Sequence, residues 1–125
     1  MLYLDQILQK SRILNCHKFE FMYCIISTTT DSKEIIDKIS NSLIKSGYSP
    51  CVQVIDNIKS IYKWNDKIEK SIEYKMIIKS IDKHSDNIVK IIKSLHNYEV
   101  AEIIKHDISI ENNVYENWFL ENINK

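Results

Sequence analysis

The clearest candidates for chemistry are His96 and Glu99, which stand three positions apart at the end of a predicted helix. Imidazole and carboxylate groups suit divalent metals, and copper(II) stands at the top of the divalent affinity order. Cys51 would add a thiolate if the fold brought it close. These residues predict a weak divalent-metal site that favours copper(II), and no tightly bound cofactor. The competing interpretation makes His96 a hydrogen-bonded helix-end residue and Cys51 a small buried core residue.

Aromatic and charged side chains form a second candidate group. Tyr62 and Trp64 stand two positions apart, so they share one face of a strand. Such a pair can bind a planar ligand. More commonly it packs against other protein side chains, and in this chain we expect that packing to be between two subunits of an oligomer. Lys67 and Lys79 can form ion pairs with Glu69, Glu73 or Glu102. These pairs are usually solvated contacts, although a cleft can use the lysines to hold an anion.

The sequence argues against an enzyme. Cys51 and His96 are the only plausible nucleophile and base, and no third residue that would orient the base is evident. The chain has one glycine, Gly47, and one proline. Glycine-rich phosphate-binding loops need several glycines, so Rossmann dehydrogenases, P-loop NTPases and protein kinases are excluded. A cysteine-dependent hydrolase is the weakest hypothesis.

Composition and charge limit the possible partners. The 17 basic and 17 acidic residues give a formal net charge of zero, which argues against nucleic acid. The longest uncharged apolar run, 21–30, is too short to span a bilayer, so we expect no membrane partner. The three cysteines show no CxxC spacing, which favours a reducing compartment and a cytoplasmic location. The start of the chain does not resemble a signal peptide.

Hydrophobic periodicity predicts the secondary structure. Asp31 is the expected N-cap of the first helix, with Glu34 as its capping-box partner, and Gly47 is the expected end. The last helix is expected to start at Asn112 or Asn113. His17, His84 and His106 fit no ligand spacing, and we interpret them as surface residues. The expected strands cover 19–27, 51–64, 68–80 and part of 100–110. Asn65-Asp66 is the expected turn between the second and third strands, because both residue types tolerate left-handed conformations. The expected main helices cover 31–47 and 82–96, and the last helix has an apolar side of Val114, Tyr115, Trp118, Phe119 and Ile123.

This element order is β-α-β-β-α-β with a terminal helix. It is the split βαβ order of an α+β, ferredoxin-like fold, with an antiparallel sheet and both main helices on one face. The chain length of 125 residues suits one domain. We place this domain at residues 18–125 and treat residues 1–17 as an N-terminal extension.

The second strand is too long for a small domain. A 14-residue strand, 51–64, spans roughly 45 Å. A compact domain of this size is roughly 35 Å across. An overhanging hairpin with apolar residues is a pairing liability in a monomer, so its length predicts a homo-oligomer. The alternative is a strand that breaks at Asp56 and Asn57.

Several motifs resemble the CutA family of divalent-cation tolerance proteins. The resemblance covers about residues 20–120 and lies in six motifs, in the family's order and spacing. They are Cys51-Val52-Gln53-Val54, Ser60-Ile61-Tyr62-Lys63-Trp64, Asp66-Lys67-Ile68-Glu69, the segment from Glu73 to Lys79, His96-Asn97-Tyr98-Glu99-Val100-Ala101-Glu102-Ile103, and Tyr115 with Trp118. Three positions depart from the family pattern. Asn97 replaces the usual proline, Asp66 stands at a common turn glycine, and Ser27 stands where many members have cysteine.

The resemblance implies a tight homotrimer and a role in divalent-metal tolerance, chiefly for copper. It also implies that these motifs line a cleft between subunits. We assign to that cleft Tyr62, Trp64, Lys67, Glu73, Lys79, Tyr98 and Glu102, and we assign His96, Glu99 and Cys51 to the metal site. CutA proteins also resemble PII-type signalling trimers. The alternative function is therefore a regulatory or scaffold trimer that binds a small anion or a partner protein in the cleft.

Overall fold

The computed structural model describes residues 22–125. The predicted N-terminal extension, residues 1–17, lies outside the described residues. The elements are β1 (Tyr23–Thr30), α2 (Lys33–Lys45), β2 (Cys51–Trp64), β3 (Lys67–Ile81), a 3₁₀ turn (Asp82–His84), α3 (Ser85–Leu95), β4 (Ile103–Ile108) and α4 (Asn113–Glu121). This is the predicted order.

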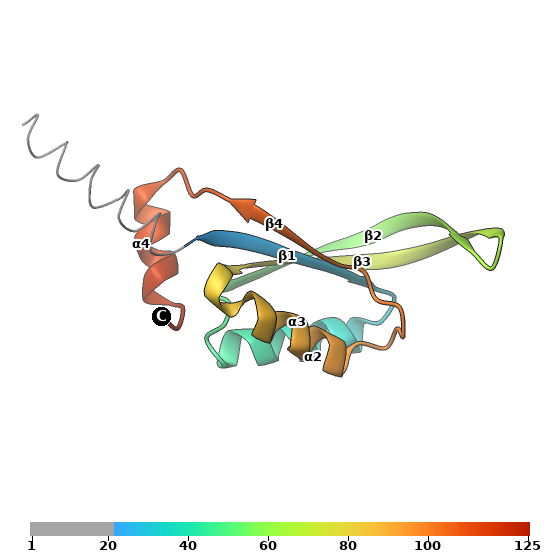
Figure 1. The fold of residues 1–125 in the computed structure, drawn as a ribbon, viewed down its shortest axis with the longest axis horizontal. Helices are drawn as coiled ribbons and strands as arrows, with labels where there is room; N and C mark the ends of the chain where they lie inside the picture. The colour runs from blue at the N-terminus through green and yellow to red at the C-terminus, as the bar shows by residue number, and fades with distance from the viewer. Residues whose placement is uncertain (1–21) are drawn as a thin grey trace, which may run out of the picture.

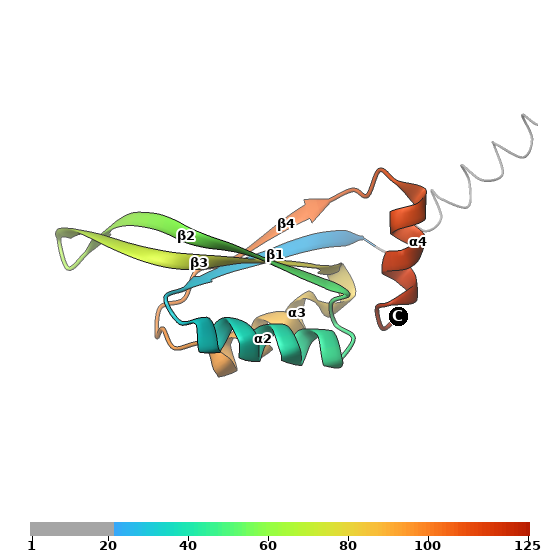
Figure 2. The ribbon, with the colours of Figure 1, turned by 180° about the vertical axis from the view of Figure 1, so that it is seen from behind.

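The four strands form one antiparallel sheet in the order β2-β3-β1-β4. Helices α2 and α3 lie against the same face of this sheet, and α4 lies at the end opposite the hairpin tip (Figures 1 and 2). The main core lies between the sheet and the two helices and includes Ile26, Ile39, Met76, Ile78 and Ile92, all fully buried. The predicted ferredoxin-like α+β fold is confirmed.

Local sequence explains the ends of α2. The N-cap is Ser32, whose Oγ accepts a hydrogen bond from the Ile35 N–H, so the prediction of Asp31 as the cap was wrong by one residue. Gly47 follows the helix with a φ of +76° and donates its N–H to the Ile44 carbonyl. A glycine adopts this left-handed conformation without strain, so its place after the helix agrees with the prediction.

The start of α3 differs from the prediction. A short 3₁₀ turn comes first, and no side chain caps the helix. His84 in this turn is 6% exposed, and its Nε2 is hydrogen-bonded to the Asn124 carbonyl near the chain end. The expectation that His84 lies on the surface was therefore wrong. His106 on β4 is exposed, as predicted.

Strand β2 runs from Cys51 to Trp64 without a break, so the alternative of a broken β2 was wrong, although its pairing with β3 shifts register at Asp56 and Asn57. The turn of the β2–β3 hairpin is Asn65-Asp66, and both residues have positive φ, as tight hairpin turns require. The pairing of β1 with β3 ends at Tyr74, and the hairpin extends well beyond that point (Figure 1). The outer part of the hairpin therefore has no neighbouring strand among residues 22–125.

Helix α4 buries only part of its predicted apolar side: Phe119 and Ile123 are buried as predicted, and Val114 and Trp118 are not. Val114 is 79% exposed and Trp118 is 42% exposed, whereas Glu116 is 1% exposed. Phe119 is buried, with its ring edge-on to Tyr23 at 5.5 Å between centroids. The hydrophobic periodicity therefore predicted the helix correctly but assigned some exposed side chains to its buried face. No helix within residues 22–125 is long and apolar enough to cross a membrane.

Candidate functional site

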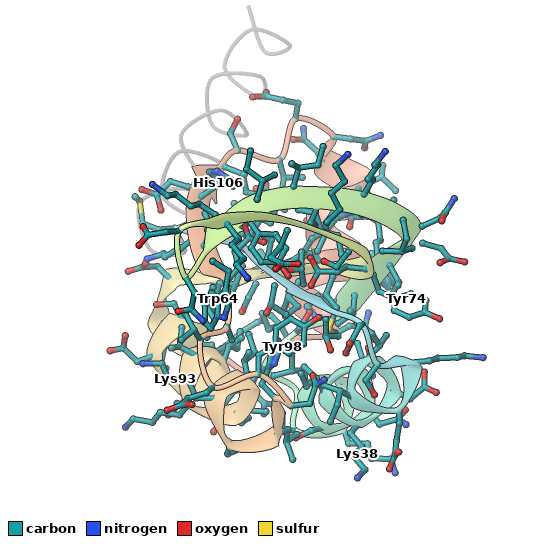
Figure 3. All side chains as sticks on the ribbon, turned by 90° about the vertical axis from the view of Figure 1, so that its right-hand side faces the viewer. Lys38, Trp64, Tyr74, Lys93, Tyr98 and His106 are labelled. Atoms are coloured by element: carbon teal, nitrogen blue, oxygen red, sulfur yellow. The ribbon has the colours of Figure 1, made fainter. Side chains whose placement is uncertain are left out.

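A pocket of about 910 Å³ opens between the outer hairpin and the segment that joins α3 to β4. We call it the hairpin pocket. Figure 3 looks along the molecule from the hairpin end and labels Trp64 and Tyr98, both of which line the pocket. The other lining residues are Thr29, Ser60, Ile61, Tyr62, Glu69, Glu73 and the rest of segment 97–102.

A β-bulge in β2 determines which side chains face the pocket. Ile55 pairs with Lys75 and Ile58 pairs with Glu73, so β2 contains one residue more than β3 between these pairs. Asn57 has a φ of +60° in this bulge. The extra residue reverses the alternation of β2 relative to a regular strand.

Beyond the bulge, Tyr62 lies directly opposite Glu69, and Trp64 lies opposite Lys67. Directly opposed residues share a face, and residues two or four apart on β3 also share it. Tyr62, Glu69 and Glu73 therefore come to the same side of the hairpin. The prediction that Tyr62 and Trp64 lie on one strand face agrees with this register.

His96 ends α3 and holds the pocket segment in place. Its Nε2 is 2.9 Å from the Thr29 carbonyl, and its Nδ1 accepts the Tyr98 N–H at 2.9 Å. Because Nδ1 is the acceptor, Nε2 carries the proton and donates to Thr29. Both nitrogens are thus occupied, and metal ligation by His96 requires the loss of one of these bonds. This geometry is that of the competing interpretation, a hydrogen-bonded helix-end residue.

Asn97 adds a second attachment between this segment and β1. Its Oδ1 accepts the Thr30 hydroxyl at 2.6 Å, and its Nδ2 donates to the Asp31 carboxylate at 2.9 Å. The resemblance to the CutA family places a proline at this position in most members. Two side-chain hydrogen bonds here restrain a residue that lacks the rigid proline ring.

Glu73 and Tyr98 form a hydrogen-bonded pair inside the pocket. The Tyr98 hydroxyl donates to Glu73 Oε2 at 2.8 Å. Glu73 is only 7% exposed. Burial, followed by the hydrogen bond to Glu73, raises the pKa of the Tyr98 phenol above its usual range. The neutral tyrosine therefore remains a hydrogen-bond donor to this carboxylate at all physiological pH values.

The charged side chains that line the pocket all have the same sign. They are Glu69, Glu73, Glu99 and Glu102, and no lysine, arginine or histidine of residues 22–125 lines it. Lys67 and Lys79, predicted as cleft residues, do not line the hairpin pocket. Lys79 pairs with Cys51 across the strands, and its Nζ is 3.4 Å from the Tyr115 hydroxyl.

The three predicted metal ligands do not come together in one chain. Cys51 pairs with Lys79, which pairs with Ile25, whereas His96 bonds to Thr29. Ile25 and Thr29 are four residues apart on β1, which is about 13 Å along the strand. The fold therefore does not bring the Cys51 thiol to His96 within one chain. These two residues were the nucleophile and base of the hydrolase hypothesis, so the fold does not support that pairing either. Within residues 22–125, no three His, Cys, Asp or Glu side chains group closely enough to hold a metal.

Sequence reasoning singled out six of the pocket residues but missed others. Glu69 was considered only as an ion-pair partner, and Ser60 and Asn97 were not selected as site residues. The alternation of Glu69 and Glu73 on β3 and of Ser60 with Tyr62 on β2 was a usable signal, because each pair shares a strand face. Asn97 stood out in the sequence only as a replacement of the family's proline, and its role became clear from its contacts with Thr30 and Asp31.

Comparisons with known proteins agree with the fold and the motifs. The family model for the CutA1 divalent ion tolerance protein matches residues 24–122. Protein CutA of Mus musculus is 31% identical over 90 residues, which are 72% of this chain and 51% of that protein. The chain thus spans about half the length of this relative. Divalent-cation tolerance protein CutA of Thermus thermophilus is 26% identical over 98 residues, covering 78% of this chain and 95% of that one.

Solved structures show the same similarity. CutA1 from Oryza sativa has a TM-score of 0.78 at 26% identity, with 83% of this chain and 95% of that chain covered. CutA1 from Shewanella sp. SIB1 has a TM-score of 0.78 at 29% identity, with 83% and 97% covered. Since the family model spans most of the described domain and the folds superpose over it, this chain belongs to the CutA1 divalent ion tolerance protein family.

Proposed function

We propose that this protein acts in divalent-cation tolerance as a homotrimer, and that it binds divalent ions weakly in a cleft formed by the hairpin pocket and a neighbouring subunit. Copper(II) is the favoured ion, since it has the highest affinity of the divalent series for nitrogen and oxygen sites. The observation that carries the proposal is the uniform negative charge of the hairpin pocket, whose described lining has four glutamates and no basic side chain.

The hairpin surface supports the assembly. Ile61, Ile68 and Ile72 are 61%, 78% and 58% exposed. The register places Ile68 and Ile72 on the hairpin face opposite to Glu69 and Glu73. Such an apolar stripe on an unpaired, overhanging hairpin is stabilised by contact with another chain. The proposal of three subunits rests on the resemblance to the family, and the exposed apolar face of the hairpin is the proposed contact surface between them.

The alternative of an anion-binding regulatory trimer has less support. An anion needs cationic side chains or free backbone N–H groups, and the described lining of the hairpin pocket carries four carboxylates instead. Lys67 and Lys79 were the predicted cations of the cleft, and neither lines the hairpin pocket.

The test is calorimetric titration of the full-length protein with copper(II). We expect weak binding in the wild type, and a marked loss when Glu99 and Glu102 are both replaced by glutamine. Because both nitrogens of His96 are already hydrogen-bonded, His96→Ala should weaken binding less than the double glutamine variant. Affinity should also fall in acid, since carboxylate ligands must be deprotonated.

The matched control is Glu121→Gln, which removes an exposed carboxylate from the end of α4. It should bind copper(II) as the wild type does. If the Glu99→Gln/Glu102→Gln variant keeps wild-type affinity while it remains a trimer, copper(II) binds elsewhere. If the wild type binds no better than that double variant at any pH, direct metal binding in the hairpin pocket is wrong.

A further inference from the structure

The hairpin pocket combines acidic walls with aromatic rings. Tyr62, Trp64 and Tyr98 line it together with the four glutamates. Aromatic faces attract ammonium groups through cation–π interactions, which are strongest for tryptophan. A metal ion that keeps its hydration shell gains little from these rings. The lining therefore suits an organic cation with methylene groups better than it suits a small bare ion.

Glu73 is the second, independent observation. It is more than nine-tenths buried, it lines the pocket, and it forms no ion pair with any lysine of residues 22–125. Its Oε2 accepts from Tyr98, while no described donor bonds to its Oε1. A buried carboxylate without a cation is costly. A positive group that entered the pocket would offset this cost.

The spacing of the carboxylates selects the shape of the cation. Glu69 and Glu73 are four residues apart on one face of β3, about 13 Å along the strand. Glu99 and Glu102 stand across the pocket on the segment that leads to β4. One ion cannot contact carboxylates so far apart, and no three acidic groups of the described chain converge. A linear molecule with ammonium groups at intervals can contact several of them.

We propose that the hairpin pocket binds a linear polyamine, with one ammonium group at Glu73 and Tyr98 and its chain along Trp64 and Tyr62 toward Glu69. This inference rests on the proposed cation-binding cleft and names an organic ligand class for it. The methylene chain packs against the aromatic rings, and the remaining ammonium groups pair with the more exposed glutamates. Divalent metal ions compete for the same carboxylates.

The direct test is fluorescence titration of the full-length, assembled protein with spermidine. The chain has two tryptophans, Trp64 and Trp118. In a Trp118→Phe background, the emission of Trp64 alone reports the pocket. We expect a saturable change in Trp64 emission on addition of spermidine. Butylamine, which has only one ammonium group, should bind with an affinity at least about tenfold lower than that of spermidine. A neutral diol of similar length should cause no change.

Glu73→Gln is the most informative variant. The amide keeps the side-chain shape and its carbonyl still accepts the Tyr98 hydroxyl, so only the charge is lost. We expect spermidine affinity to fall at least about tenfold, because removing one partner of a buried charge pair weakens binding strongly. The unliganded variant should be more stable than the wild type, since an unpaired buried charge is gone. Glu121→Gln should change neither property.

Two results would overturn the inference. The first is equal affinity for spermidine and butylamine, with equal effects of Glu73→Gln and Glu121→Gln, which would indicate only diffuse attraction to acidic surface. The second is no binding by the wild type together with a weakened oligomer in Glu73→Gln, which would show that a lysine from a second copy pairs with Glu73. Neither result changes the copper(II) titration or the trimer mass expected for the wild type. Failure of this inference is therefore distinguishable from failure of the proposed function.

Discussion

The Glu73–Tyr98 pair shows how two ordinary residues become a site. Neither residue type is unusual for a strand or a loop. Their roles come from burial of Glu73 and from a single hydroxyl that reaches it from the other side of the pocket. The same hydrogen bond ties the segment 97–102 to β3, so one contact both positions the pocket wall and stabilises its least exposed carboxylate.

Replacing Tyr98 with phenylalanine tests this contact. We expect a loss of about 1–3 kcal/mol in the free energy of unfolding at pH 7, because a buried carboxylate loses its only described donor. The pKa of Tyr98 is raised in the folded state. Its stabilisation is therefore complete below the usual tyrosine value of about 10 and is lost as pH rises further. The difference between the two proteins should shrink above pH 10.

Urea unfolding at pH 7 and at pH values above 10 measures both effects. The control is Tyr62→Phe, which removes an exposed hydroxyl that forms no described hydrogen bond. It should lie within about 0.5 kcal/mol of the wild type. A Tyr98→Phe variant that matches this control at pH 7 would show that the hydrogen bond does not support the pocket.

At the scale of elements, the end of α2 is joined to the end of the chain. The Asn124 N–H donates to the Gly47 carbonyl at 2.8 Å, its Nδ2 donates to the Ser46 carbonyl, and its own carbonyl is bonded to His84. Three distant segments thus meet at one asparagine. Because Gly47 lies directly under that side chain, α2 and the chain end depend on the same glycine.

Gly47→Ala should therefore destabilise the protein. A Cβ at Gly47 would lie 2.5 Å from Asn124 Nδ2, and the φ of +76° is unfavourable for alanine. We expect a loss of about 1–3 kcal/mol in chemical unfolding. In the double variant with Asn124→Ala the steric part disappears, so its loss should be smaller than the sum of the two single losses. Additive losses would rule out the predicted clash.

Elements whose local sequence decides them could be predicted, and those decided by distant contacts could not. The Asn65-Asp66 turn and the ends of β2 follow from local chemistry, and the structure has them as predicted. The burial of Glu116 on α4 and of His84 depends on segments far away in sequence. Similarly, the motif around His96 drew attention to the correct loop, but its role as a hydrogen-bonded positioning residue appears only with Thr29 in place.

The site shows the same division. Tyr62, Trp64, Glu73, Tyr98, Glu99 and Glu102 were selected from the sequence, and all of them line the hairpin pocket. Cys51 was selected by residue type alone, and the strand register places it near the other end of the sheet. The sequence marked Asp56 and Asn57 as the position of a break in β2, and the structure has a bulge there instead, whose extra residue reverses which side chains of β2 face the pocket.

At the scale of the whole molecule, a single chain leaves part of its backbone and apolar surface uncovered within residues 22–125. Among the described strands, β2 and β4 are the edges of the sheet, and the hairpin extends past the other strands (Figure 1). Ile61, Ile68 and Ile72 remain exposed on that hairpin. A formal net charge of zero adds no overall repulsion between copies. All of these features favour association through the hairpin, which would also close the hairpin pocket.

The measurement that tests this account most directly is the mass of the purified full-length protein in solution, by light scattering coupled to size-exclusion chromatography over a range of concentrations. We expect a concentration-independent mass of three times the 14.8 kDa of one chain. An Ile68→Glu/Ile72→Glu variant, which places charges on the exposed stripe, should shift the mass toward one chain. A wild-type mass of 14.8 kDa at every concentration would contradict the homotrimer, and with it the cleft between subunits.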